Sequence, residues 1–126
     1  MPSAILHRWD DQTPRELAPG VRRRFVTTGR MTMARFALAR NAVVPKHSHE
    51  HEQVSYVLSG AVRFTVGGEE ILVRGGEVLQ IPSWVEHGVT VVEDAEVIDV
   101  FSPVRQDWLD GTDTYFQAEQ TAVRRP

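Results

Sequence analysis

The sequence contains no cysteine among its 126 residues. Disulfide bonds, thiolate metal ligands and thiol nucleophiles are therefore excluded. A strong excess of one charge is also absent, since the formal net charge is −3, and the composition does not favour nucleic acid or a membrane as a partner. No apolar run approaches the length of a membrane span, and the N-terminus lacks the continuous apolar core of a signal peptide. We therefore expect a cytoplasmic protein.

The length predicts a single domain over residues 1–126 that can bury its own core. Short segments of alternating apolar and polar residues follow one another at even spacing, and glycine pairs such as Gly67-Gly68 separate some of them. This pattern predicts an all-β fold, an antiparallel sandwich or barrel with its core over about 21–102. The expected strands are 21–28, 31–39, 53–58, 61–66, 70–74, 78–81, 89–92 and 97–101, with turns at 59–60 and 93–94. We expect an irregular arm over 1–20 and a short helix within 105–120.

Histidines form the most informative cluster in the chain. His47 and His49 would lie on the same side of an extended strand, because side chains alternate between its faces. His87 follows an apolar run far downstream and could join them between paired strands. Imidazole is the commonest protein ligand for mid-series divalent metals, so the three residues predict a metal site. The remaining donor is either Gln53 or His51. A straight strand would place His51 on the same face as His47 and His49.

Asp99 is a second unusual residue. Alternation over 97–101 places Val97, Asp99 and Phe101 on one core-facing side, where a carboxylate is unfavourable unless it is paired or functional. Asp99 could pair with a buried arginine such as Arg24 or Arg35, or it could transfer protons in a pocket.

The same strand is followed by a possible anion-binding residue. Arg105 comes after a Pro103 turn, where it could be a solvated loop residue or a bidentate ligand for a substrate carboxylate.

These residues resemble the two metal-binding motifs of the cupin superfamily, small jelly-roll barrels that bind one metal. The first motif reads Asn41, His47, His49, Gln53 and Gly60, with Asn for the usual leading Gly and Gln for the usual Glu. The second reads Gly76, Pro82, Trp84, His87 and Val91, which lacks the inner Gly and the final Asn. The resemblance implies a cupin-type antiparallel jelly-roll barrel with an N-terminal arm and a short C-terminal tail. It also favours Gln53 over His51 as the remaining ligand.

The stretch from Pro45 to Gly60 is similar to the KdgF-like pectin-degradation cupins, which open the ring of 4,5-unsaturated monouronates to give a linear 5-keto-4-deoxyuronate. The spacing Asp-x-Phe-x-x-x-Arg of that group falls on Asp99, Phe101 and Arg105. The resemblance implies that these three are catalytic residues.

The resemblance also implies that one divalent transition metal (Ni, Zn, Fe, Mn or Co) is held by His47, His49, Gln53 and His87. Neutral ligands would leave the ion its full charge for Lewis-acid chemistry. The alternatives are a metal-dependent dioxygenase, a polyketide cyclase and a non-catalytic small-molecule-binding cupin.

The expected partners are a small, carboxylate-bearing substrate and a second copy of the chain. A small open barrel has edge strands that need covering, and the N-terminal arm could cover those of a partner. We therefore expect a homodimer. Trp84, beside His87, is expected to narrow the mouth of the pocket.

Overall fold

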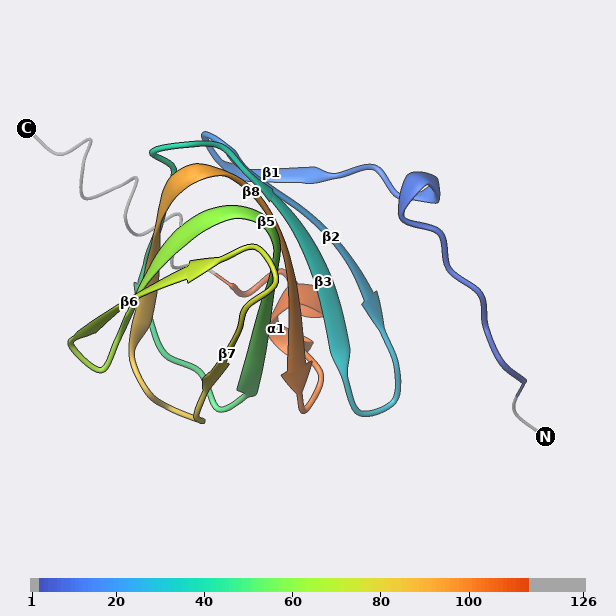
Figure 1. Ribbon diagram of the computed structural model, residues 1–126. Helices are drawn as coiled ribbons and strands as arrows, with labels where there is room; N and C mark the ends of the chain where they lie inside the picture. Colours follow the sequence, from blue (N-terminus) through green and yellow to red (C-terminus); the bar gives the residue numbers. More distant parts are fainter. Residues whose placement is uncertain (1–2, 114–126) are drawn as a thin grey trace, which may run out of the picture.

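The computed structural model describes residues 3–113, whose regular secondary structure is almost entirely antiparallel β-strand (Figure 1). The all-β prediction is therefore confirmed. In chain order the elements are η1 (Trp9–Asp11), β1 (Arg15–Ala18), β2 (Val21–Thr27), β3 (Thr32–Leu38), β4 (Val43–His47), β5 (Glu52–Val66), β6 (Glu69–Arg74), β7 (Val78–Ile81), β8 (His87–Ser102) and α1 (Gln106–Asp110).

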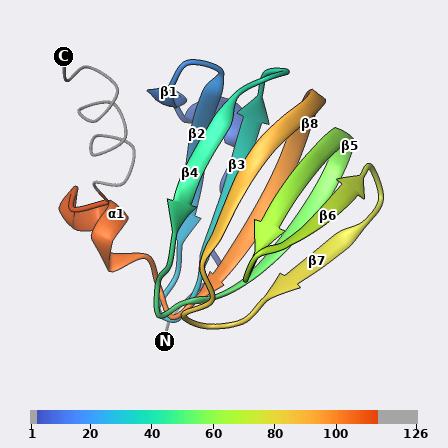
Figure 2. The same ribbon diagram turned by 90° about the vertical axis from the view of Figure 1, so that its left-hand side faces the viewer.

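Two long strands, β5 and β8, pair with each other and organise the fold. The first part of β5 lies between β8 and β7, and the later part of β8 lies between β5 and β3. The remaining parts of the two strands pair outward with β6 and β4. The strands form one continuous eight-stranded sheet that bends along β5 and β8 into two halves, referred to below as the two sheets, which curve around a common interior (Figure 2). This is the jelly-roll arrangement.

The turns expected at 59–60 and 93–94 were wrong, because both segments lie inside continuous strands. The register between β5 and β8 shifts around Ser59, Gly60 and Ala61, which indicates bulges at which the strand bends. Gly60 has φ 84°, and a Cβ there would lie 2.1 Å from the backbone oxygen of Asp94. Glycine at this position therefore lets the two strands pass close together where they bend, without ending either of them.

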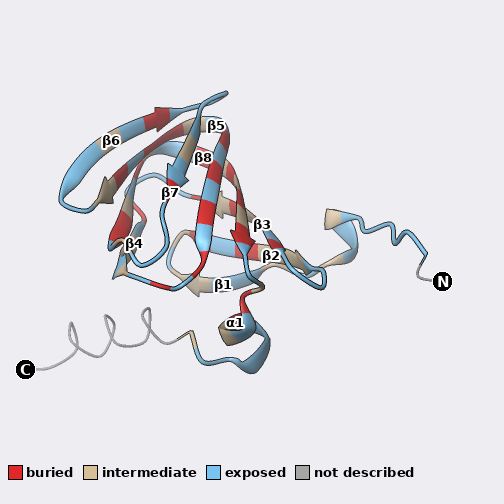
Figure 3. Cartoon of the chain, turned by 90° about the horizontal axis from the view of Figure 1, so that it is seen from below, coloured by how far each residue is buried: buried red, intermediate tan, exposed pale blue. Residues whose placement is uncertain are grey.

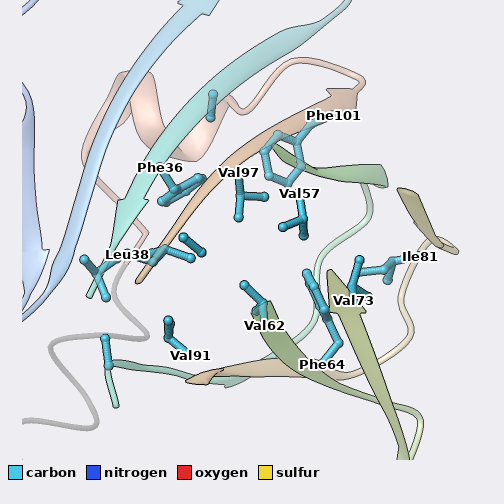
Figure 4. Close-up of a cluster of buried hydrophobic side chains, with 14 of the residues drawn as sticks. Phe36, Leu38, Val57, Val62, Phe64, Val73, Ile81, Val91, Val97 and Phe101 are labelled. Atoms are coloured by element: carbon cyan, nitrogen blue, oxygen red, sulfur yellow. The ribbon is translucent and has the colours of Figure 1, made fainter. Parts of the chain in front are cut away.

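The inner faces of the two sheets form the core. Buried and exposed residues alternate along the strands, as Figure 3 shows for β5 and β8. Phe64, Val62 and Val91 face Phe36, Val97 and Phe101 across the interior (Figure 4). This packing leaves one end of the interior to polar residues.

The two ends of the described chain differ from the expectation. The arm expected to be irregular over 1–20 contains η1 and β1, and β1 pairs with β2. The helix expected within 105–120 is the short α1, and 114–120 lie outside the described residues. Residues 3–8 project from the barrel (Figure 1). Within 3–113, no helix has the length and apolar character that crossing a membrane requires.

Candidate metal centre and adjoining cavity

Three histidines converge at one end of the barrel. His47 ends β4 and lies opposite His87, which begins β8. His49 comes from the loop that follows β4, so the expectation that His47 and His49 share one strand was wrong. Their ring centroids are 4.4 Å (His47–His87), 4.8 Å (His49–His87) and 5.5 Å (His47–His49) apart. One ligand atom from each lies within 4.8 Å of the others.

The backbone fixes the orientation of all three rings. His47 Nδ1 donates to the Pro45 carbonyl at 2.7 Å, His49 Nδ1 to the His51 carbonyl at 3.1 Å, and His87 Nδ1 to the Val85 carbonyl at 2.8 Å. A carbonyl only accepts, so each Nδ1 carries the proton and each Nε2 keeps a lone pair. Metal-binding histidines are usually held in this way.

Burial keeps the three imidazoles neutral at ordinary pH. It lowers the pKa of His47 to about 4 and the pKa of His49 to about 3, and neighbouring positive groups add to both shifts. Burial also lowers the pKa of His87. Protonated rings would repel a cation, whereas neutral rings can bind one.

The fourth histidine of this segment has a different environment. His51 Nε2 donates to the Val104 carbonyl at 3.0 Å, and His51 is not part of the three-histidine cluster. The chain leaves its strand after His47, so strand alternation does not apply to His51. Gln53 is buried on β5 and lines the same cavity as His47 and His87. Its Nε2 donates to Ser55 Oγ at 2.9 Å.

Asp99 lies on the inner face of β8, directly opposite Ser55 of β5. Burial raises the pKa of Asp99 to about 6, while hydrogen bonds from Ser55 and Gln53 and the charge of Arg105 act in the opposite direction. Within the described residues, its Oδ1 has no hydrogen-bond partner. The suggested pairing with Arg24 or Arg35 was wrong, since Arg35 pairs with Glu96 and Arg24 donates to the Gln12 carbonyl.

Arg105 is buried rather than solvated. Its Nε and Nη2 donate to the two carboxylate oxygens of Asp107 at 3.0 and 2.7 Å. Its guanidinium carbon lies 4.7 Å from the ring centre of Phe101 and 4.4 Å from that of Trp108. The pair with Asp107 leaves the Nη1 side of the guanidinium for another anion.

One cavity joins these residues. Its volume is about 40 Å³, and it lies between the two sheets. Apolar side chains form most of the wall, and the polar lining residues are His47, Gln53, His87, Asp99 and Arg105. Trp84 is 68% exposed and does not line the cavity, so the expectation that it narrows the mouth was wrong.

Three lining or supporting residues were missed from the sequence. Ser55 could have been found, because it alternates with Gln53 and Val57 on an inward face. Asp107 follows Arg105 by two residues but is not part of any motif that would have drawn attention to it. Trp108 was placed only within a short helix, and nothing in the sequence indicated that it enters the core.

The residues fit a bound divalent cation. His49 Nε2 and His87 Nε2 are buried and find no hydrogen-bond partner in the part of the chain that the structure describes, which is unfavourable unless another group satisfies them. Imidazole nitrogens suit zinc, nickel, iron and related ions, and an amide oxygen could add a donor. The donor set does not select one metal among these.

Comparisons with known proteins agree with this geometry. The family model described as "Cupin domain" matches residues 34–101. The pectin degradation protein KdgF of Dickeya dadantii (strain 3937) is 34% identical over 104 residues, which cover 79% of this chain and 94% of that protein.

Solved structures give the same result. The structure of KdgF from Halomonas sp. superposes with a TM-score of 0.79 at 30% identity, covering 84% of this chain and 99% of that one. An RmlC-like cupin from Shewanella frigidimarina NCIMB 400 gives a TM-score of 0.78 at 25% identity, covering 84% and 96%. The jelly roll, the three-histidine cluster and these matches together show that the chain belongs to the cupin family and resembles KdgF.

Proposed function

We propose that this protein is a metal-dependent enzyme that opens the ring of 4,5-unsaturated monouronates to linear 5-keto-4-deoxyuronates. The observation that carries the proposal is a three-histidine cluster in contact with a cavity that also contains a buried carboxyl group and a buried arginine. The likeness to KdgF, a pectin degradation protein, supports the substrate class.

His47, His49 and His87 would hold the metal, with the Gln53 oxygen as a further ligand. A divalent ion held by neutral ligands supplies Lewis-acid polarisation of a bound oxygen. Arg105 would bind the substrate carboxylate through the Nη1 side that Asp107 leaves open. Phe101, which is buried beside His49, would form an apolar wall for the sugar ring.

Asp99 is the proposed proton-transfer group. Its carboxylate takes the proton of the anomeric hydroxyl, and the bond between the anomeric carbon and the ring oxygen breaks. The electron pair passes to the ring oxygen, which becomes the enolate oxygen and then the new ketone oxygen, while the proton is returned to the enol-ether carbon. The reaction is an isomerisation without redox change. A pKa near 6 allows a carboxyl group both to accept and to return a proton near neutral pH.

The test follows the absorbance of the unsaturated uronate with purified, metal-analysed protein. Wild-type protein is expected to remove the enol-ether absorbance without consuming dioxygen. Asp99→Asn is expected to lower kcat by about 10²- to 10⁴-fold while keeping metal content and fold.

Two results would overturn the proposal. One is an Asp99→Asn protein, folded and metal-loaded, that turns over at the wild-type rate. The other is a metal-loaded wild-type protein that binds the uronate but leaves its absorbance unchanged, as a binding protein would. Dioxygen consumption would indicate a dioxygenase instead.

A further inference from the structure

Ser55 connects the candidate metal centre to the proposed proton-transfer group. It lies on β5, is 0% exposed, and faces the interior two residues after Gln53. Across the sheet it is paired directly with Asp99 of β8. Its side chain therefore lies between a proposed metal ligand and a proposed catalytic carboxyl group.

The hydrogen bonds have a direction that chemistry fixes. Gln53 Nε2 donates to Ser55 Oγ at 2.9 Å, since an amide nitrogen cannot accept. Ser55 Oγ therefore keeps its own hydrogen for the Asp99 carboxyl group, which lies directly opposite on β8 and whose pKa Ser55 lowers. Gln53 also lowers the pKa of Asp99, so its amide nitrogen side faces both Ser55 and the carboxyl group. The amide oxygen is left as the atom of Gln53 that is free to bind a cation.

We propose that Ser55 is a positioning residue that fixes the Gln53 amide so that its oxygen, and not its NH₂ group, is available to the metal. This inference rests on the metal site of the proposed function. If the Gln53 amide group were rotated by 180°, Ser55 would have to donate its hydrogen to Gln53 Oε1 and could no longer donate it to Asp99. The NH₂ group would then replace the oxygen, and an amide NH₂ does not bind a divalent ion.

The test is a double-mutant cycle with Ser55→Ala, Gln53→Glu and the double variant. Each protein is stripped of metal, and its affinity for Co²⁺ alone is measured by titration calorimetry, with the visible Co²⁺ spectrum recorded in parallel. In the wild-type Gln53 background, Ser55→Ala is expected to weaken Co²⁺ binding by about 10- to 100-fold, the usual effect of removing a ligand's supporting hydrogen bond.

The Gln53→Glu background is the matched control. A carboxylate has an oxygen at both positions, so it has no wrong orientation. There Ser55→Ala is expected to change the affinity by no more than about twofold, the usual limit of additivity. A packing defect would instead weaken binding equally in both backgrounds, and that result would overturn the inference.

The remaining outcomes separate this inference from the proposed function. Unchanged affinity of Ser55→Ala in the wild-type Gln53 background overturns the role of Ser55 but leaves the metal site intact. Failure of the wild-type protein to bind Co²⁺ overturns the metal site and the inference with it.

If the Ser55→Ala variant does not fold, nuclear magnetic resonance of the wild-type protein tests whether the Gln53 amide is held by hydrogen bonds. The Gln53 side-chain N–H groups are expected to exchange with water much more slowly than those of exposed Gln80. Equally fast exchange overturns the inference.

Discussion

Asp99 is a residue whose proposed function and contribution to stability oppose each other. Burial raises the pKa of Asp99 from 3.8 to about 6, so the folded protein holds its proton more tightly than the unfolded chain does. The neutral form is therefore favoured by folding at low pH, and this advantage is lost as the pH rises through about 6. At neutral pH the fold contains a buried carboxylate that destabilises it.

We predict that Asp99→Asn stabilises the metal-free protein above pH 6. The rise of this pKa from 3.8 to about 6 corresponds to about 3 kcal/mol, and the difference in stability from wild type should shrink between pH 6 and pH 4. Urea unfolding of chelator-treated protein across that pH range measures it. Asp10→Asn, at an exposed position, is the control and should show no comparable change. An Asp99→Asn protein less stable than wild type at pH 8 would contradict the prediction.

The histidine cluster leads to a second prediction at the level of single residues, which concerns the amount of bound metal. His87→Ala should reduce the bound metal to well below one ion per chain, because it removes one of the three clustered nitrogens. His51→Ala should keep one ion, since His51 donates to the Val104 carbonyl outside the cluster. Metal analysis by mass spectrometry on protein purified without chelator checks both. Equal loss in the two variants would contradict this assignment.

The sequence motifs identified the clustered histidines because ligand spacing is a local property. The choice between Gln53 and His51 depends on where the strand ends, which the residue pattern did not reveal. Ser55 is one of many small polar residues on an inward face, and only its register opposite Asp99 makes it notable. Hydrogen-bond partners across strands are not encoded in the sequence near either residue.

At the level of elements, α1 positions Arg105. Trp108 is buried within this short helix and makes edge contacts with Phe25, Phe36 and Phe101, at centroid distances of 5.4, 6.3 and 5.1 Å. Arg105 precedes the helix and lies over the Trp108 ring. The helix is too short to be stable alone, so its docking depends on this one aromatic side chain.

We predict that Trp108→Ala destabilises the protein by about 3–5 kcal/mol, the usual loss for a buried large aromatic residue. It should also raise KM for the uronate, because Arg105 loses a ring that supports it. Urea unfolding and steady-state kinetics measure the two effects. Leu109→Ala, at a half-exposed neighbouring position, should change stability by less than about 0.5 kcal/mol. Similar losses in both variants would contradict the anchoring role of Trp108.

The ends of strands were predictable where the residues of the turn itself determine its conformation. The Gly67-Gly68 hairpin between β5 and β6 follows directly from its residues. The continuity of β5 and β8 was not predictable, because Ser59-Gly60 is equally typical of a turn and of a bulge. What decides between them is the close approach of Asp94 to Gly60, a contact between distant segments.

At the level of the whole molecule, one outer face carries exposed apolar side chains. Met33, Val54, Tyr56, Leu58 and Val78 are 38–60% exposed on neighbouring strands of one sheet. Ile5 and Leu6, in the segment that projects from the barrel, are 77% and 78% exposed. Apolar surface on both the sheet and the projecting segment favours burial against a second copy.

We propose a homodimer and predict a mass twice the 14.2 kDa of the chain by size-exclusion chromatography with light scattering. Val78→Asp should give the monomer mass, because β7 is an edge strand whose outer residue would carry a charge into the interface. Leu72→Asp on β6, an exposed apolar position of the other sheet, should leave the dimer intact. A wild-type monomer at micromolar concentration would contradict the proposal.

The rings of the candidate metal centre are all oriented by main-chain carbonyls, those of Pro45, His51 and Val85. Every amino acid brings the same carbonyl, so exchanging the side chains at these positions does not remove the acceptors. Substitutions at the rim of the cavity could therefore change which molecules it admits without disturbing the orientation of the three imidazoles.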